Sequence, residues 1–242
     1  MDLSLVDRIQ ENYYNVLRRI RSAAEYADRD PLTIKLMVVT KGRSLEYVDA
    51  AIQCNLRLFG ENYVQEGITK IRAFARYSDI EWHMIGHVQS RKAQDVCNNF
   101  ACVHSLDSVK LASRLDRSAN EIGRKLPVLL ECNVSGEENK FGFPAWLETN
   151  WESLANDISQ ILALSNLDVR GLMTMPPYFP DPEEVRPFFR RLVRFKNFLA
   201  RRFPVNDWNE LSMGMSEDYE IAVQEGSTIV RIGTAILGPR MK

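Results

Sequence analysis

Apolar and polar positions follow two periods along this chain, one typical of helices and one typical of buried strands. Over residues 3–26 apolar side chains recur every three to four positions between charged ones, which predicts one amphipathic helix. Eight short apolar runs follow, as expected of strands buried on both faces. These runs span residues 34–40, 56–60, 81–86, 101–105, 127–134, 169–173, 210–214 and 228–233.

Helical patterns separate the apolar runs. They span residues 45–54, 63–76, 90–98, 108–122, 146–164, 182–203 and 217–224. We expect Asp107 to cap the helix that begins at Ser108, and Ser216 to cap the one that begins at Glu217, because their side chains accept hydrogen bonds from free amides of a first turn.

Eight strands that alternate with helices predict a single (β/α)₈ barrel of the TIM type. We assign residues 1–242 to one domain, in which residues 1–30 form an extra N-terminal helix packed on the barrel, and we expect no C-terminal β-domain. An open doubly wound sheet is the alternative. Such a sheet favours a glycine-rich fingerprint after its first strand, which Lys41-Gly42-Arg43-Ser44 does not provide.

Composition and charge argue against several classes of function. The chain has 31 Lys and Arg against 32 Asp and Glu, so no global field would attract nucleic acid or an anionic membrane. No apolar run has the length of a membrane span and the first residues do not resemble a leader, so we expect a cytoplasmic protein. Three histidines, His83, His87 and His104, are too few and too dispersed to predict a metal site.

Lys41 directly follows the first apolar run. A lysine there has its stem in low dielectric and its amine at the mouth of the fold. Desolvation lowers the pKa of an amine, so more of it is the neutral nucleophile that condenses with an aldehyde. A lysine at the end of a strand usually extends into water. The assignment of Lys41 as a nucleophile therefore depends on other residues of the sequence.

Two loops near the end of the chain predict a matching phosphate site. Gly214 ends the seventh apolar run and Ser216 follows it, while Gly233-Thr234 ends the eighth. Their hydroxyls and unhindered amides suit a phosphate dianion, and the loops after strands seven and eight usually bind phosphate in barrels. Strands one and eight are neighbours in a closed barrel, so the set predicts an aldehyde and phosphate receptor that includes Lys41.

Arg231 precedes Gly233 by two residues and therefore lies on the same face of the last strand. Beneath a pyridine ring it would donate to the ring nitrogen and hold it unprotonated, because a guanidinium cannot accept a proton. The alternative is a structural ion pair with a strand carboxylate such as Glu131.

Six blocks of this sequence resemble the signatures of the pyridoxal phosphate homeostasis proteins (the YggS/PROSC-type family). The blocks are Val39-Thr40-Lys41, Phe59-Gly60-Glu61-Asn62-Tyr63-Val64-Gln65-Glu66, Trp82-His83-Met84-Ile85-Gly86-His87-Val88-Gln89-Ser90, Gly171-Leu172-Met173-Thr174-Met175, Leu211-Ser212-Met213-Gly214-Met215-Ser216 and Val230-Arg231-Ile232-Gly233-Thr234. Gly42, where threonine is common, and Arg91, where asparagine is common, depart from the family pattern and affect only local loop shape.

The resemblance implies an alanine-racemase-like barrel that binds pyridoxal 5′-phosphate (PLP) covalently, with Lys41 as the Schiff-base lysine. It implies phosphate contacts from Ser212, Ser216, Gly233 and Thr234, a pyridine nitrogen facing Arg231, and Asn62 close behind the cofactor. As partners we expect PLP itself and PLP-dependent apoenzymes, but neither nucleic acid nor a membrane. We expect a monomer.

For function, these observations favour a protein of intracellular PLP homeostasis, with little or no turnover, over an enzyme. A racemase needs bases on both cofactor faces, and racemase-type barrels take the second base from a later β-domain, for which we expect no room after Gly233. A ring nitrogen bonded to arginine is also a poor electron sink. The alternatives are a PLP-dependent amino-acid racemase or decarboxylase, and a Schiff-base aldolase that uses Lys41 on a phosphosugar.

Overall fold

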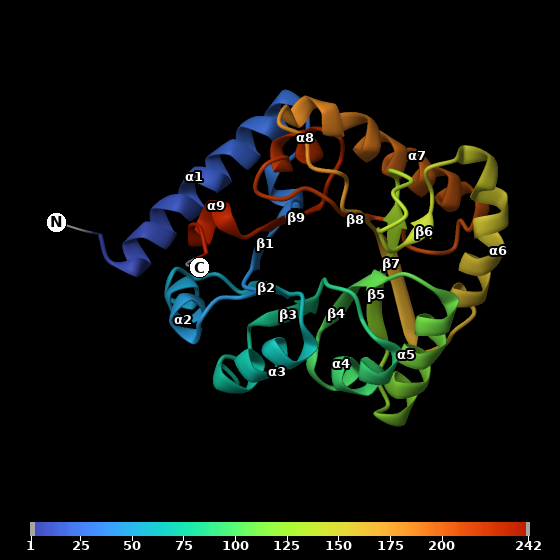
Figure 1. Cartoon of the computed structure of the whole chain (residues 1–242), viewed down its shortest axis with the longest axis horizontal. Coiled ribbons are helices and arrows are strands. Elements are labelled where there is room, and N and C mark those ends of the chain that lie inside the picture. Colours follow the sequence, from blue (N-terminus) through green and yellow to red (C-terminus); the bar gives the residue numbers. More distant parts are fainter. Residues whose placement is uncertain (1–2, 241–242) are drawn as a thin grey trace.

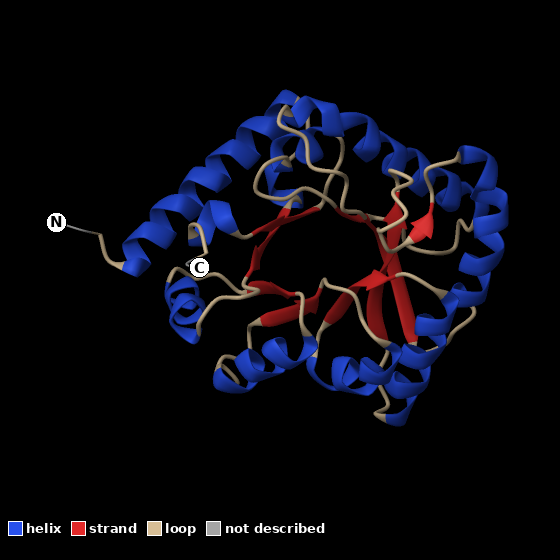
Figure 2. Cartoon of the chain, viewed as in Figure 1, coloured by secondary structure: helices blue, strands red, loops and turns tan. Residues whose placement is uncertain are grey.

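Eight parallel strands close into a barrel in the computed structural model, which describes residues 3–240 (Figures 1 and 2). The strands are β1 (Lys35–Val39), β2 (Leu58–Glu61), β3 (Glu81–Met84), β4 (Cys102–Leu106), β5 (Leu126–Asn133), β7 (Leu167–Met173), β8 (Glu210–Ser212) and β9 (Ile229–Ile232). Their order is β4-β3-β2-β1-β9-β8-β7-β5, and β4 also pairs with β5. This closure confirms the predicted barrel and rules out the open sheet.

Helices surround the barrel in Figure 2. They are α1 (Leu5–Tyr26), α2 (Leu45–Gln53), α3 (Val64–Ala73), α4 (Ala93–Asn99), α5 (Val109–Glu121), α6 (Trp151–Leu162), α7 (Arg186–Arg202), α8 (Tyr219–Gln224) and α9 (Thr234–Leu237). Short 3₁₀ turns span Pro31–Thr33, Ser90–Lys92, Glu148–Asn150 and Pro182–Val185.

The N-terminal helix α1 packs against α8, α9 and α2, and so covers the side of the barrel where its first and last strands meet (Figure 1). Its start is fixed by a capping box, in which the Ser4 hydroxyl accepts from the Asp7 amide and the Asp7 carboxylate accepts from the Ser4 amide. The assignment of residues 1–242 to one domain extends beyond the described residues and stays a prediction.

Several predicted element ends were wrong. Ser216 does not cap α8, which begins at Tyr219 after the N-cap residue Asp218. At α5 the N-cap is Ser108 and not Asp107, since the Ser108 hydroxyl accepts from the Leu111 amide at 3.3 Å. The pattern also missed two short elements, α9 and the two-residue strand β6 (Phe143–Pro144), which pairs with the end of β5.

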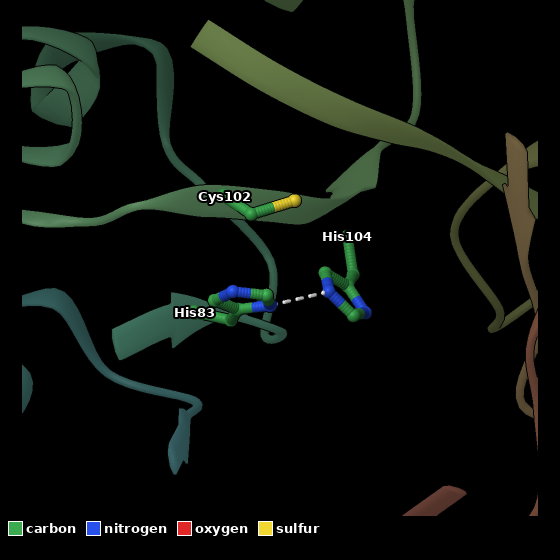
Figure 3. A group of neighbouring side chains, drawn as sticks. All are labelled: His83, Cys102 and His104. Atoms are coloured by element: carbon green, nitrogen blue, oxygen red, sulfur yellow. Dashed lines mark hydrogen bonds between the residues drawn. The ribbon is translucent and has the colours of Figure 1, made fainter. Parts of the chain in front are cut away.

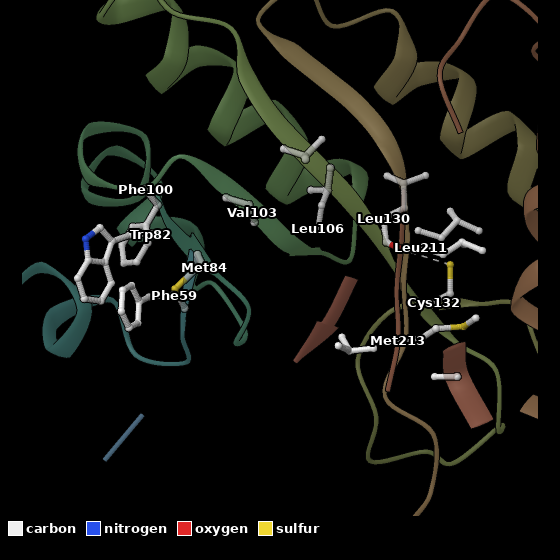
Figure 4. Close-up of a cluster of buried hydrophobic side chains, with 14 of the residues drawn as sticks. Phe59, Trp82, Met84, Phe100, Val103, Leu106, Leu130, Cys132, Leu211 and Met213 are labelled. Carbon is white, nitrogen blue, oxygen red and sulfur yellow. Dashed lines mark hydrogen bonds between the residues drawn. The ribbon is translucent and has the colours of Figure 1, made fainter. Parts of the chain in front are cut away.

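The core has two parts. The larger part lies between strands and helices, where the stacked rings of Phe59 and Trp82 have centroids 4.9 Å apart (Figure 4). The smaller part fills the barrel interior and consists of the buried side chains of Met37, Ile85, Leu129, Met173 and Ile229. Because alternate residues of a strand face inward, Met37 lies on the inner face of β1 below Lys41.

Gly86 brings the loops after β2 and β3 together. A Cβ atom at Gly86 would lie 2.3 Å from the carbonyl oxygen of Asn62, which is closer than any side chain allows. Only glycine therefore lets the backbone of Asn62 pass across the end of β3 and reach the mouth of the barrel.

We expect Gly86→Ala to lower the free energy of unfolding by about 1–3 kcal/mol, because the Asn62 backbone has to move away from the new methyl group. Urea denaturation measures the change. The control is Gly123→Asn, since Gly123 has φ +65 with no atom within 4 Å of a built Cβ, and asparagine tolerates this backbone region. Equal denaturation midpoints for Gly86→Ala and the wild type would contradict the expectation.

Candidate functional site

A cavity of about 230 Å³ opens at the carboxyl ends of the strands. The residues that line it are Val39, Lys41, Asn62, Ile85, Met175, Met215, Ser216, Glu217, Arg231, Gly233, Thr234 and Arg240. Six residues predicted for the site, from both ends of the chain, therefore meet around one cavity. They are Lys41, Asn62, Ser216, Arg231, Gly233 and Thr234.

Ser212, the seventh predicted residue, does not line this cavity. Its side chain is fully buried beneath it, and its hydroxyl already contacts Arg231 and His104. The structure therefore places Ser212 behind the arginine and away from the cavity wall, a position that does not suit direct contact with a phosphate.

Lys41 has the electrostatic setting expected of a nucleophilic amine. Burial lowers the pKa of its ammonium group, and the positive charges of Arg240 and Arg231 lower it further, against a smaller opposing effect of Glu61. Burial and the two arginines therefore favour the neutral amine at the cavity wall.

A buried ion network holds the backbone on both sides of Lys41. The Lys70 ammonium group, on α3, donates to the carbonyl oxygen of Thr40 at 2.6 Å and to the carboxylates of Glu61 and Glu66 at 2.7 Å each. Glu66 also accepts from the amide of Gly42 at 2.6 Å. The residues before and after Lys41 are thus tied to one cluster of charges, which orients the lysine between them.

The loops after β8 and β9 come together at the part of the cavity wall that adjoins β1. The Ser216 hydroxyl accepts from the amide of Ala235 at 3.2 Å, which joins the first loop to the start of α9. Gly233 lies close to β1, where an added Cβ would be 3.3 Å from the carbonyl oxygen of Val39. Hydroxyls of Ser216 and Thr234 and the backbone at Gly233 therefore form one polar wall, which suits an anionic group.

Arg231 lies in the barrel interior with 3% of its surface exposed. It donates to the backbone carbonyl and the hydroxyl of Ser212, each at 2.7 Å, and to the carbonyl of Thr174 at 2.8 Å. Burial lowers the pKa of its guanidinium group to about 10, so the group stays cationic at neutral pH. Among the described residues no ion pair joins it to Glu131, so the structural ion pair considered above is not formed.

Asn62 supplies an unused acceptor beside the cavity. Its side-chain oxygen is buried and has no hydrogen-bond partner among the described residues. A buried polar atom without a partner is costly, and a bound ligand with a hydroxyl or amino group would satisfy it.

Arg240 is a site residue that sequence reasoning missed. The segment before it is held by Arg43, which donates to the carbonyl oxygens of Gly238 and, at 3.0 Å, Pro239. This contact brings Arg240 to the cavity beside Lys41 and adds a second cation there. No local pattern in the sequence indicates such a return of the chain.

The expected dispersion of the histidines was also wrong. His83 and His104 lie on neighbouring strands, 2.9 Å apart between Nδ1 and Nε2, with the thiol of Cys102 beside them (Figure 3). His83 and Cys102 are register partners of β3 and β4, so strand pairing brings the three side chains together. His87 lies elsewhere, where its ring stacks on Phe141.

No helix in residues 3–240 has the length and apolar character that a membrane crossing requires.

Comparison with known proteins gives the family. The chain matches the family described as "Alanine racemase, N-terminal domain" over residues 7–241. It is 40% identical over 230 residues to the pyridoxal phosphate homeostasis protein of Aquifex aeolicus, covering 95% of this chain and 97% of that protein. The corresponding protein of Vibrio alginolyticus is 42% identical over 236 residues, covering 96% and 97%. This chain belongs to the pyridoxal phosphate homeostasis protein family.

Solved structures agree with membership of this family. PipY of Synechococcus elongatus PCC7942, solved with PLP bound, is 32% identical with a TM-score of 0.82, covering 95% of this chain and all (100%) of that one. Alanine racemase from Streptomyces coelicolor A3(2) is only 16% identical, with a TM-score of 0.69 over 96% of this chain and 58% of that enzyme. The second similarity is one of fold alone, and the predicted alanine-racemase-like barrel is confirmed.

We expect Lys70→Met to lower the free energy of unfolding by about 3–5 kcal/mol, because it leaves the buried carboxylate of Glu61 without its cation. Lys92→Met is the control. Its half-exposed pair with Asp95, at 3.1 Å, should contribute less than about 1 kcal/mol. Chemical denaturation of both variants measures the difference, and losses of equal size would contradict a special role for the buried network.

Glu131 predicts a distinct pH dependence of stability. Burial raises the pKa of its carboxyl group from 4.5 to about 7, so the folded protein holds a proton there that the unfolded chain releases. The free energy of unfolding therefore falls as pH rises from about 4.5 to 7.

Glutamine does not titrate, so in Glu131→Gln the free energy of unfolding should not fall between pH 4.5 and about 7 for this reason. Relative to the wild type, the free energy of unfolding of the variant should therefore increase by up to about 3 kcal/mol over this pH range. Denaturation midpoints measured at several pH values test this. Glu138→Gln, which removes an exposed carboxylate on the following loop, is the control. Parallel pH profiles for wild type and Glu131→Gln would contradict the account.

Proposed function

We propose that this protein binds pyridoxal 5′-phosphate for intracellular PLP homeostasis, as a Schiff base on Lys41 and with little or no turnover. The observation that carries the proposal is that one cavity combines an amine of lowered pKa with a polar wall suited to an anion. The names of the relatives and the PLP-bound PipY structure support the choice of this aldehyde and phosphate over a phosphosugar.

The residues present fit such a cofactor. Ser216, Gly233 and Thr234 would hold the phosphate, and Arg231 would donate to the pyridine nitrogen. The unpartnered oxygen of Asn62 would accept from a polar group of the ligand. We assign Ser212 to supporting Arg231, because its hydroxyl is engaged behind that residue.

Bound PLP supplies a reactive aldehyde. The neutral amine of Lys41 would be the group that condenses with this aldehyde, with loss of one water molecule. The reverse reaction with water would release the cofactor. We further propose that PLP-dependent apoenzymes receive the cofactor and that the protein acts as a monomer in the cytoplasm.

Arg231 favours a carrier over a racemase or decarboxylase. Its guanidinium group stays charged at neutral pH and cannot accept a proton, so it would donate to the ring nitrogen and leave the pyridine unprotonated, which makes the ring a weaker electron sink. An unprotonated ring stabilises a carbanion at the α-carbon of an amino acid less well than a protonated one does.

The absorbance spectrum of the protein mixed with PLP tests the proposal. Wild type should show a visible imine band that borohydride abolishes, and Lys41→Ala should lack the band. Lys35→Ala is the matched control, because Lys35 lies at the other end of β1 and pairs with Glu210 at 2.8 Å. A wild type that stays colourless with PLP, or a Lys41→Ala variant with an undiminished band, would refute the proposal.

A further inference from the structure

A chain of hydrogen bonds runs through the barrel from the cavity towards its opposite end. Arg231 donates to the Ser212 hydroxyl, which lies 2.9 Å from Nδ1 of His104. Nε2 of His104 lies 2.9 Å from Nδ1 of His83. Nε2 of His83 in turn lies 3.4 Å from the carboxylate of Glu81, whose side chain is 68% exposed.

The order of protons along this chain follows from Arg231. A guanidinium group only donates, so the Ser212 oxygen accepts from it and directs its own proton to Nδ1 of His104. Burial holds the pKa of His104 well below its usual value, so the ring is neutral and carries its single proton on Nε2. That proton points to Nδ1 of His83, which leaves the Nε2 proton of His83 directed at Glu81.

The reverse order is less favourable. It would aim N–H groups of both Arg231 and His104 at the Ser212 oxygen and leave the hydroxyl proton without its acceptor on His104. Every donor has an acceptor only when the chain runs from the arginine to the glutamate.

We propose that Ser212, His104 and His83 are positioning residues that fix Arg231 against the pyridine end of the bound cofactor. This inference depends on the proposed function. Ser212 offers both its carbonyl and its hydroxyl oxygen to one Arg231 nitrogen, and His104 keeps the hydroxyl oriented as an acceptor. The hydrogen-bond chain therefore determines which hydrogens of the Arg231 guanidinium group bond to protein acceptors below the cavity.

His83 and His104 also form, with Cys102, a group that could bind a metal ion, since one ligand atom of each lies within 4.8 Å of the others (Figure 3). Two observations favour the hydrogen-bond chain. The two ring nitrogens are 2.9 Å apart, closer than the separation of about 3.3 Å between ligands of a tetrahedral zinc ion. Burial also raises the pKa of the Cys102 thiol, so it stays protonated without a metal.

Histidine NMR tests the proton order without any cofactor. The protein has three histidines, so labelling with ¹⁵N-histidine gives few signals, and single His→Gln variants assign them. We expect His104 to be protonated on Nε2 and not on Nδ1. Ser212→Ala should shift the Nδ1 signal of His104, because that nitrogen loses its hydroxyl donor, and Cys102→Ala should leave the signal unchanged. A proton on Nδ1 of His104 would overturn the inference. So would a zinc-induced loss of this signal that Cys102→Ala prevents, which would identify a metal site.

PLP titration tests the positioning role. His104→Leu should weaken PLP binding by roughly tenfold and shift the ¹⁵N resonance of the pyridine nitrogen, because Ser212 loses its acceptor. His104→Gln, which offers both an acceptor and a donor, should restore most of the affinity. If His104→Leu does not fold, Ser212→Ala takes its place.

Unchanged PLP affinity and an unchanged pyridine resonance in a folded His104→Leu or Ser212→Ala variant would overturn this inference alone. A wild type that binds no PLP would overturn the proposed function and this positioning role together.

Discussion

A buried, permanently charged guanidinium group is the constraint on which the barrel interior depends. Arg231 cannot release its proton at neutral pH, and a charge removed from water without partners costs several kcal/mol. Its acceptors are the carbonyl of Thr174 and two oxygens of Ser212, just after β7 and at the end of β8. The strand register pairs Met173 with Ser212 and Ser212 with Ile229. It therefore positions the acceptors of the Arg231 charge as well as aligning the sheet.

The lysines near the cavity show how partners decide between structure and chemistry. Lys70 is as buried as Arg231, and its ammonium group donates to three oxygen partners. Lys41 instead has the cations Arg240 and Arg231 as neighbours, and these join with burial in lowering the pKa of its ammonium group. Two lysines that lie close together near the end of β1 therefore differ: oxygen acceptors surround Lys70, whereas burial and neighbouring cations favour the neutral amine of Lys41.

The sequence predicted the parts of this structure that depend on local pattern. Eight apolar runs correspond to the eight barrel strands, because a strand buried on both faces needs an unbroken apolar stretch. Lys41, Asn62 and Gly233-Thr234 were found because they follow directly from strand ends, where a barrel collects its site.

Features that depend on pairing between distant strands were missed or misplaced. The contact between His104 and Ser212 joins residues 108 positions apart, and the return of Arg240 to the cavity depends on Arg43 and the C-terminal turn. Ser216 was expected as a helix cap, but Asp218 accepts from the amide of Met215 at 2.6 Å and starts the helix later. Hydropathy does not encode such side-chain geometry.

The central claim is that Lys41 carries the cofactor. Borohydride reduction of wild-type protein loaded with PLP, followed by proteolysis and mass spectrometry, tests it most directly. The account predicts one stoichiometric pyridoxyl-phosphate group, on the peptide that contains Lys41. A label found mainly on another lysine, or no label on a protein that retains PLP, would contradict it.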